Sequence, residues 1–278
     1  MTAAARGAIL EVPPSSHQLV QRARARTGRS RDMSLLSNKN IAARERLIFA
    51  LDVDSADDAK AAVERLGDSV EFYKIGLSLL FSSGFWDLFE FLKDKGKKSF
   101  ADIKFFDVPE TVRAAVAKVV GSGAAFATVH AQEAMIQAAL EARGSASDAS
   151  LKILAVTVLT SLDSGDLNAM GFSGVSTLDL VLSRAGRMLG LGCDGVISSG
   201  LEVPELRKKF GENFLIVVPG IRPVENTDDQ KRTVDVEGAF QAGADYIVVG
   251  RPIRQAADPK HAAESIQRRI AALFPASE

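Results

Sequence analysis

The chain has 278 residues, of which 46% are hydrophobic and 25% charged, the ordinary usage of a folded globular protein. Its formal net charge of −1 favours neither nucleic acid nor an anionic membrane surface as a partner, and it has no apolar run of about 18 residues that would predict a transmembrane helix. One cysteine, Cys193, rules out an internal disulfide and fits a reducing compartment, so we expect a cytoplasmic protein.

The first segment, residues 1–43, differs from the rest of the chain. It is rich in arginine, poor in acidic residues and interrupted by Pro13-Pro14. We expect a disordered basic N-terminal extension, or a leader translated from a start codon assigned too early, with Met33 as the later start. An arginine-rich organelle presequence is the alternative. Removal of residues 1–40 is expected to leave folding and catalysis unchanged.

Residues 44–278 repeat one pattern, in which a short apolar run of strand length precedes a longer helical stretch. Eight runs predict strands: Leu47–Val53, Phe72–Gly76, Ser99–Phe106, Ala125–His130, Ile153–Leu159, Gly195–Ser198, Phe214–Val218 and Tyr246–Val249. Continuous apolar runs suit parallel strands that are covered on both faces. Eight units without a linker predict a single α/β domain, a (β/α)₈ or TIM barrel. A doubly wound sheet is the alternative, disfavoured because no nucleotide-type glycine loop follows the first run.

Between the strands, Asp54–Leu66 opens with residues that cap helix N-termini, and Pro109 stands at the start of another helical pattern. Two connections, Thr160–Ser176 and Arg222–Asp235, are long and polar. Both follow strands, so both belong to the C-terminal face of the barrel. Long loops at this face are typical lids or binding loops.

Charged residues occur at the ends of the first three strands. Asp52 closes the first run, Lys74 lies within the second, and Asp102 and Lys104 lie two residues apart in the third. Alternation along a strand puts Asp102 and Lys104 on one face, and burying charges beneath the helices would be too costly, so that face points into the barrel. We expect the four side chains to converge with alternating sign.

Two other interpretations of these charges stay open. They could form an ion-pair network that only ties the strands together, although such networks add little net stability. The carboxylates could instead hold Mg²⁺, which the two lysines disfavour because an ammonium takes the place of the cation. His130, at the end of the fourth strand, is interpreted as a hydrogen-bonded structural histidine in preference to a catalytic one.

An anion site is predicted after the last two strands. Pro219-Gly220 follows the seventh strand and Gly250-Arg251 follows the eighth. The glycines let backbone N–H groups approach an anion, and barrels often bind phosphate at this position. An exposed Arg251 without a ligand is the alternative.

The segment from Asp102 to Thr111, Asp-Ile-Lys-Phe-Phe-Asp-Val-Pro-Glu-Thr, resembles the Asp-x-Lys-x-x-Asp motif of the bacterial-type orotidine 5′-phosphate decarboxylase family. Further blocks resemble those of the family in the same order: Leu51-Asp52, Lys74-Ile75-Gly76, Thr160-Ser161, Pro219-Gly220-Ile221-Arg222-Pro223 and Gly250-Arg251-Pro252-Ile253. One departure concerns a phosphate-binding Gln, where Val224-Glu225-Asn226 stands here and Gln230 lies a few residues on.

The resemblance implies a lyase of de novo pyrimidine biosynthesis that converts orotidine 5′-phosphate to uridine 5′-phosphate (UMP) and CO₂ without metal or organic cofactor. The implied catalytic residues are Lys104, as proton donor to C6 of the pyrimidine, with Asp102, Lys74 and Asp107. The implied substrate-binding residues are Asp52, Thr111, Ser161, Arg222, Gly250 and Arg251. The family also implies a homodimer with shared active sites, in which Asp107 and Thr111 reach the partner's site, and no nucleic-acid or membrane partner.

Two rival functions share parts of this pattern. Mg²⁺-dependent sugar-phosphate enzymes of the same superfamily also carry Asp-x-Lys-x-x-Asp, but the Val108-Pro109-Glu110-Thr111 block favours the pyrimidine enzyme. A catalytically silent barrel that senses a phosphorylated ligand is disfavoured because a pure binder has no need of a proton donor.

Overall fold

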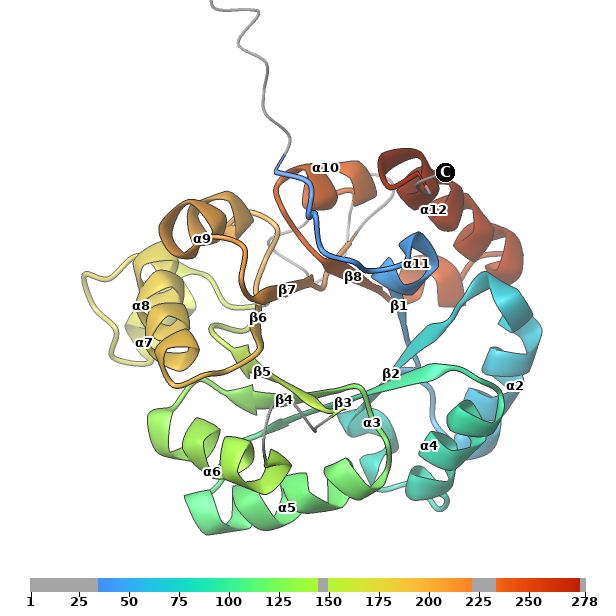
Figure 1. Cartoon of the computed structure of the whole chain (residues 1–278), viewed down its shortest axis with the longest axis horizontal. Helices are drawn as coiled ribbons and strands as arrows, with labels where there is room; N and C mark the ends of the chain where they lie inside the picture. Colours follow the sequence, from blue (N-terminus) through green and yellow to red (C-terminus); the bar gives the residue numbers. More distant parts are fainter. Residues whose placement is uncertain (1–34, 145–149, 222–233, 276–278) are drawn as a thin grey trace, which may run out of the picture. The chain divides into compact units, whose positions relative to one another are not determined.

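Residues 35–144, 150–221 and 234–275 are described by the computed structural model. Eight parallel strands close into a barrel in sequence order (Figure 1). They are β1 (Leu47–Ala50), β2 (Phe72–Gly76), β3 (Lys98–Phe105), β4 (Phe126–His130), β5 (Lys152–Val156), β6 (Gly195–Ile197), β7 (Leu215–Val218) and β8 (Tyr246–Val249). Pairing of Leu47 with Ile247 joins β1 to β8 and closes the ring. The predicted (β/α)₈ barrel is confirmed, and the doubly wound alternative is wrong.

Helices follow the strands, and most of them cover the outside of the ring (Figure 1). They are α2 (Ala56–Leu66), α3 (Leu77–Leu80), α4 (Phe85–Asp94), α5 (Pro109–Gly121), α6 (Glu133–Arg143), α7 (Ser164–Ala169), α8 (Thr177–Gly190), α9 (Val203–Phe210), α10 (Val236–Gln241), α11 (Arg251–Arg254) and α12 (Pro259–Leu273), with 3₁₀ turns η1 (Ala43–Arg46) and η2 (Gly67–Ser69). The cap of α2 is the predicted kind, because Ser55 Oγ accepts the Asp58 N–H at 3.1 Å. None of the described helices is long and apolar enough to cross a bilayer.

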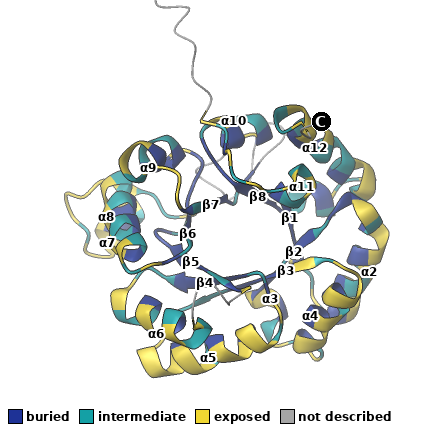
Figure 2. Ribbon diagram, viewed as in Figure 1, coloured by how far each residue is buried: buried dark blue, intermediate teal, exposed yellow. Residues whose placement is uncertain are grey.

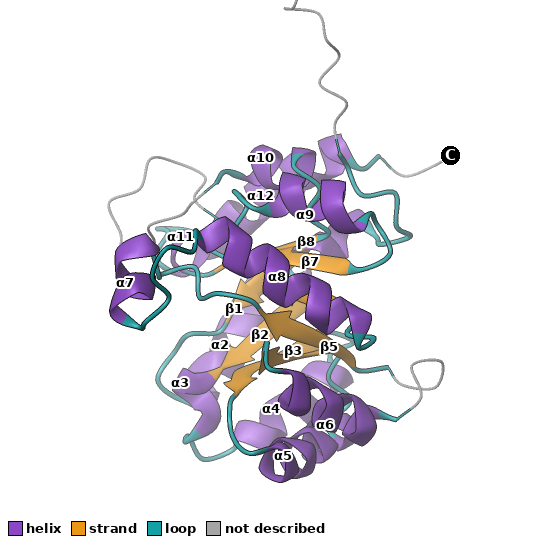
Figure 3. Ribbon diagram, turned by 90° about the vertical axis from the view of Figure 1, so that its left-hand side faces the viewer, coloured by secondary structure: helices purple, strands orange, loops and turns teal. Residues whose placement is uncertain are grey.

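The core contains two clusters of buried apolar residues, and most of the strand ribbon is coloured as buried in Figure 2. Alternate strand residues such as Leu47 and Phe49 point outward and pack against the helices. The inward set includes four aromatic rings, which pack on one another near the N-terminal ends of their strands: Phe72, Phe100, Phe126 and Tyr246. This aromatic layer fills the N-terminal end of the barrel interior, so open space remains at the C-terminal ends of the strands. The short helices α3, α7 and α11 lie at that end (Figure 3).

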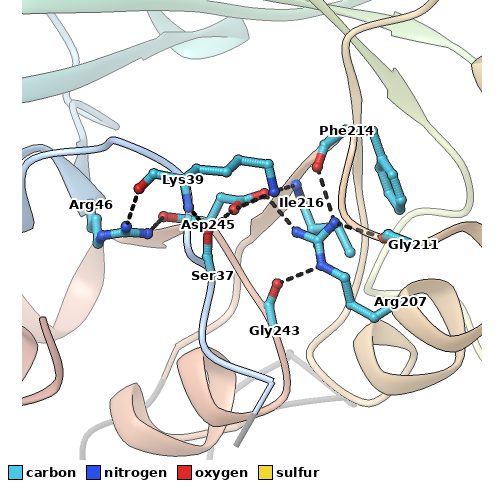
Figure 4. A network of polar contacts seen from close by, with 9 residues as sticks. All are labelled: Ser37, Lys39, Arg46, Arg207, Gly211, Phe214, Ile216, Gly243 and Asp245. Carbon is cyan, nitrogen blue, oxygen red and sulfur yellow. Dashed lines mark hydrogen bonds and ion pairs between the residues drawn. The ribbon is translucent and has the colours of Figure 1, made fainter.

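The segment before β1 packs on the opposite, N-terminal face (Figure 4). Asp245, which precedes β8 and is fully buried, accepts hydrogen bonds from Ser37 Oγ at 2.5 Å and Lys39 Nζ at 3.0 Å. The same carboxylate accepts from Arg207 Nη2 at 2.7 Å and from the Ile216 N–H at 2.8 Å. A buried carboxylate needs such donors, because an ionised group without partners is very costly inside a protein.

These contacts move the boundary of the predicted extension. The barrel unit begins at Leu35 instead of residue 44, and the Leu35 N–H donates to the Gln241 carbonyl at 3.0 Å. The expectation of a disordered extension over residues 1–43 is therefore wrong for residues 35–43, and removal of residues 1–40 would break the contacts of Ser37 and Lys39 with Asp245. Residues 1–34, for which we expected disorder, lie outside the described residues.

Candidate active site

A cavity of about 420 Å³ opens at the C-terminal ends of the strands. Its polar lining includes Asp52, Lys74, Asp102 and Lys104, from the ends of β1, β2 and β3. Apolar residues of β1, β3, β5, β6 and β8 supply the rest of the wall inside the barrel: Ala50, Phe100, Val156, Ile197 and Val248. A pocket with apolar walls and a few convergent charges is the usual form of a small-molecule site.

The four charged side chains form one chain of alternating sign. Lys74 Nζ lies 3.1 Å from Asp52 Oδ1 and 3.4 Å from Asp102 Oδ2. Lys104 Nζ lies 2.8 Å from the same oxygen of Asp102. The predicted convergence is therefore present, with Asp102 between the two ammonium groups.

Burial and pairing compete for the charge of the two inner members. Burial alone would raise the pKa of Asp102, but the ammonium groups of Lys74 and Lys104 and two hydrogen bonds outweigh it, so the pKa is lowered. Burial alone would lower the pKa of Lys74, but the carboxylates of Asp102 and Asp52 outweigh it, so that pKa is raised. Both groups therefore stay charged at neutral pH, and buried charges with shifted pKa values in a cleft mark a candidate functional site.

Strand β3 is irregular where it carries these charges. Ala101 pairs with Ala127 and Phe105 with Val129, so three residues of β3 stand opposite the single β4 residue Thr128. Within this bulge Lys104 has φ of +54°, the one positive φ of a non-glycine residue in the described part of the chain. Such a backbone conformation costs about 1–3 kcal/mol and often marks a functional site. Asp102 and Lys104 thus meet through a bulge, and the regular alternation assumed for β3 is wrong here.

Gly76 makes room for the ammonium of Lys74. A methyl group at this glycine would lie 3.0 Å from Lys74 Nζ and 3.5 Å from Asp52 Oδ1. A side chain at position 76 would therefore press on the centre of the charged cluster. The sequence block Lys74-Ile75-Gly76 contained this information, but only the structure shows why the third residue is small.

Residues of the predicted anion site line the same pocket. Gly220, Gly250 and Arg251 line the cavity, and Ser161 contributes from the connection that follows β5. Arg254, one turn of α11 beyond Arg251, also lines the cavity and was missed by the sequence analysis. A second arginine three residues after the first was the available signal. Arg222 and Gln230 lie outside the described residues.

Asp107 and Thr111 do not line the cavity of their own chain. Both are exposed, and Asp107 Oδ1 accepts the Val108 N–H at 2.6 Å. Phe106 and Val108, on either side of Asp107, are 70% and 62% exposed, which is unusual for large apolar residues. Asp107 and Thr111 are therefore exposed residues after β3 that lie outside the cavity lining.

The polar connection after β5 is partly helical. It contains α7, whose capping box joins Asp163 and Asp166 through two reciprocal hydrogen bonds. Arg184 of α8 donates to the Thr157 carbonyl at 2.7 Å, and its guanidinium lies 5.3 Å from the Phe172 ring centre. Arg184 thereby links the connection that carries Ser161 to the end of β5. The second long connection, residues 222–235, lies almost wholly outside the described residues.

His130 lies beside the cluster. Its half-buried ring packs edge-on against Phe106, with 5.2 Å between ring centres. Burial, and then the positive charges of Lys104 and Arg184, lower its pKa, so the ring is neutral at neutral pH. The contact shown is with an aromatic ring, and the hydrogen-bonded role expected from the sequence stays a prediction.

Comparison with known proteins identifies the family. The model of the "Orotidine 5′-phosphate decarboxylase / HUMPS family" matches residues 45–266. The chain belongs to this family. Orotidine 5′-phosphate decarboxylase of Methylococcus capsulatus is 56% identical over 245 residues, which cover 87% of this chain and 99% of that protein. The enzyme of the same name from Xanthomonas euvesicatoria is 49% identical over 237 residues, covering 84% of this chain and 96% of the relative.

A solved structure shows the same architecture for a family member. The crystal structure of orotidine 5′-phosphate decarboxylase from Lactobacillus acidophilus superposes with a TM-score of 0.71 at 36% sequence identity, over 81% of this chain and 99% of that chain. The family match spans the barrel from η1 into α12, so it includes all of the cavity-lining residues named above. Among the described residues, no cluster of three or more His, Cys, Asp or Glu side chains could hold a metal ion.

Proposed function

We propose that this chain is an orotidine 5′-phosphate decarboxylase, which converts orotidine 5′-phosphate to UMP and CO₂ in pyrimidine biosynthesis. The family match and the relatives of that name support the reaction. The observation that carries the residue assignment is the alternating cluster Asp52–Lys74–Asp102–Lys104 at the wall of the cavity.

Lys104 is proposed to donate the proton. When the bond between C6 and the carboxylate breaks, its electron pair stays on C6 and CO₂ leaves. The Lys104 ammonium stabilises the negative charge that develops on C6 and then protonates this carbon, which yields UMP. With 36% of its side chain exposed, Lys104 is open to the cavity, and it recovers a proton from solvent after product release.

The other three members of the cluster are proposed to hold Lys104 in place and to contact the substrate. Asp102 lies beside the substrate carboxylate in the proposed pose, so their repulsion is relieved when CO₂ departs. Lys74 holds Asp102 and Asp52 together, and Asp52 contacts the ribose. Two carboxylates and two ammonium groups sum to zero charge, so the cluster itself does not repel an anionic substrate.

The remaining residues are proposed to bind the two ends of the nucleotide. Ser161 contacts the edge of the pyrimidine. Arg251 binds the phosphate together with backbone N–H groups near Gly250, and Arg222 contributes from the loop after β7. A guanidinium suits phosphate because its donors match two phosphate oxygens at once.

A homodimer with shared active sites is proposed from the exposed surface after β2 and β3. Four large apolar residues are at least half exposed there: Leu77, Phe81, Phe106 and Val108. Apolar surface of this kind is typical of a protein interface. Asp107 lies between two of these residues, so a partner seated on this surface would receive Asp107 and Thr111 near its own cavity. We also propose residues 35–278 as the catalytic domain and the cytoplasm as its location.

The assay of Lys104→Ala tests the proposal. The purified chain should form UMP and CO₂ from orotidine 5′-phosphate in the presence of EDTA. Lys104→Ala should lower kcat by at least about 10³-fold while UMP binding changes little, because a proton donor acts in the transition state. Lys208→Ala, on the exposed face of α9, is the matched control and should keep wild-type kinetics.

Three results would contradict the proposal in different ways. Loss of wild-type turnover on chelation would favour the metal-dependent sugar-phosphate enzymes of the superfamily. Binding of UMP without any turnover would favour a sensor. A Lys104→Ala variant that keeps more than about a tenth of wild-type kcat would remove the proton-donor assignment.

A further inference from the structure

One buried side chain contacts both reactive residues of β3 and has no part in the function proposed above. Thr128 lies in β4, points into the barrel and is fully buried. It is the β4 residue that stands alone opposite the three bulged residues 102–104. A hydroxyl in the middle of β4, whose other residues except His130 are apolar, therefore meets the part of β3 that lacks regular ladder pairing.

The Thr128 hydroxyl makes two hydrogen bonds in opposite senses. Its Oγ1 accepts the backbone N–H of Lys104 at 2.9 Å. The same Oγ1 donates to Asp102 Oδ1 at 2.9 Å. Since a hydroxyl has one proton, the bond to the acceptor-only carboxylate fixes its direction, and the lone pairs are left for the Lys104 N–H.

Each bond meets a need that the bulge creates. The bulge takes the Lys104 N–H away from the regular β3–β4 ladder, and a buried N–H without an acceptor costs about 1–3 kcal/mol. Asp102 uses Oδ2 for both ammonium groups, so Thr128 holds the other oxygen. Together the two bonds fix the rotation of the carboxylate and the strained backbone of Lys104.

We propose that Thr128 is a positioning residue, which holds the Asp102 carboxylate and the Lys104 backbone in the arrangement needed for proton transfer to C6. This inference rests on the proposed function for its catalytic meaning. Its structural part, that the hydroxyl restrains Lys104 and Asp102, can be tested without substrate.

Three variants separate the hydroxyl from the volume of the side chain. Thr128→Val keeps the shape and removes both hydrogen bonds. Thr128→Ser keeps the hydroxyl and removes a methyl group. Thr157→Val is the matched control. Thr157 directly follows β5 and is also fully buried, but its Oγ1 donates to the Ile197 carbonyl and not to a member of the charged cluster.

Kinetics with orotidine 5′-phosphate provide the first measurement. Thr128→Val should lower kcat by about 10- to 100-fold and change KM by less than about threefold, because small misplacements of reacting groups act mainly on the transition state. Thr128→Ser should recover kcat to within about threefold of wild type. Thr157→Val should keep wild-type kcat even if its melting temperature falls.

Hydrogen exchange of the Lys104 amide, without substrate, provides the second measurement. In Thr128→Val this amide should exchange at least about tenfold faster than in wild type, because its acceptor has gone, whereas Thr128→Ser and Thr157→Val should retain the protection.

The two measurements divide the outcomes. Unchanged exchange and unchanged kcat in Thr128→Val would overturn the inference, and so would equal losses of kcat in Thr128→Val and Thr157→Val. If Thr128→Val is poorly folded, Thr128→Ser is compared with Thr128→Ala instead. Equal losses of kcat in these two variants would also overturn the inference, because the hydroxyl retained in Thr128→Ser should preserve activity. A wild-type chain without turnover would reject the proposed function alone, and the exchange data would still decide whether Thr128 restrains Lys104.

Discussion

Arg251 and Arg254 place two positive charges at the rim of the cavity after β8. A nucleotide monophosphate carries most of its negative charge on the phosphate, far from the reacting carbon. Binding energy gained at such a remote group can orient the base and raise the rate as well as the affinity. The two arginines differ in sequence context, since only Arg251 follows the Gly250 that lets backbone approach an anion.

We predict that Arg251→Ala lowers kcat/KM for orotidine 5′-phosphate by about 10²- to 10³-fold, because a charge-assisted guanidinium–phosphate pair contributes a few kcal/mol. Arg254→Ala, which removes a charge from the same rim, is the matched control and should have a smaller effect. The decisive comparison uses orotidine, which lacks the phosphate and should be turned over equally by wild type and Arg251→Ala. Equal losses on both substrates would show that Arg251 has a structural role.

The sequence reveals a site residue when its residue type is unusual at that position of a strand or helix, and it does not reveal one of a common type. Charges at the ends of apolar strands are costly, so Asp52, Lys74 and Asp102 stood out in the sequence. Thr128 did not, because threonine is common in strands and its side chain gives no sign of what it bonds. Gly76 was seen only as part of a motif, because the need for its small size comes from Lys74 Nζ, which no local pattern reveals.

At the level of elements, the segment before β1 packs on the barrel and supplies hydrogen-bond donors to it. Ser37 and Lys39 supply two of the donors to the buried Asp245, and the Lys39 carbonyl accepts from Arg46 Nη2 at 3.2 Å. Arg207 supplies a third side-chain donor to Asp245 from α9. The segment therefore closes an ion-paired network between η1, α9 and β8 on the face away from the cavity (Figure 4).

We predict that a chain starting at residue 41 is less stable than a chain starting at Leu35 by about 2–4 kcal/mol, because Asp245 and Arg46 lose partners while they stay buried. The melting temperature should fall by roughly 5–10 °C, whereas kcat of the folded fraction should stay the same. The comparison of the two truncations isolates residues 35–40. In the full-length chain, Lys39→Ala should reproduce part of the loss, and equal melting temperatures of the two truncations would contradict the prediction.

The elements themselves were accessible from the sequence because barrel strands are short, apolar and regularly spaced. All eight predicted runs overlap the observed strands, and α2 and α5 begin within two residues of their predicted capping and proline signals. The irregular parts of the fold could not be predicted from the sequence. The bulge at residues 102–104 depends on pairing with β4, and the packing of residues 35–43 depends on Asp245, some 200 residues away in the chain.

At the scale of the whole molecule, two predicted site residues lie away from the cavity, and their role depends on whether the protein forms a dimer. Asp107 and Thr111 follow the same strand as Lys104, but both are exposed, and the exposed apolar residues Phe106 and Val108 flank Asp107. If Asp107 completes the site of a second subunit, each active site requires Lys104 from one chain and Asp107 from the other. Subunit mixing tests this arrangement directly.

We predict that Lys104→Ala and Asp107→Ala are each poorly active alone but regain about a quarter of wild-type activity when mixed in equal amounts, because random exchange makes half of the dimers mixed and each mixed dimer has one intact site of two. Mixing Asp107→Ala with the double variant Lys104→Ala/Asp107→Ala is the control and should restore nothing, since no site then combines both residues. Light scattering should give twice the chain mass for every variant. Failure of the single variants to complement after verified subunit exchange would place Asp107 in the site of its own chain, or outside any site.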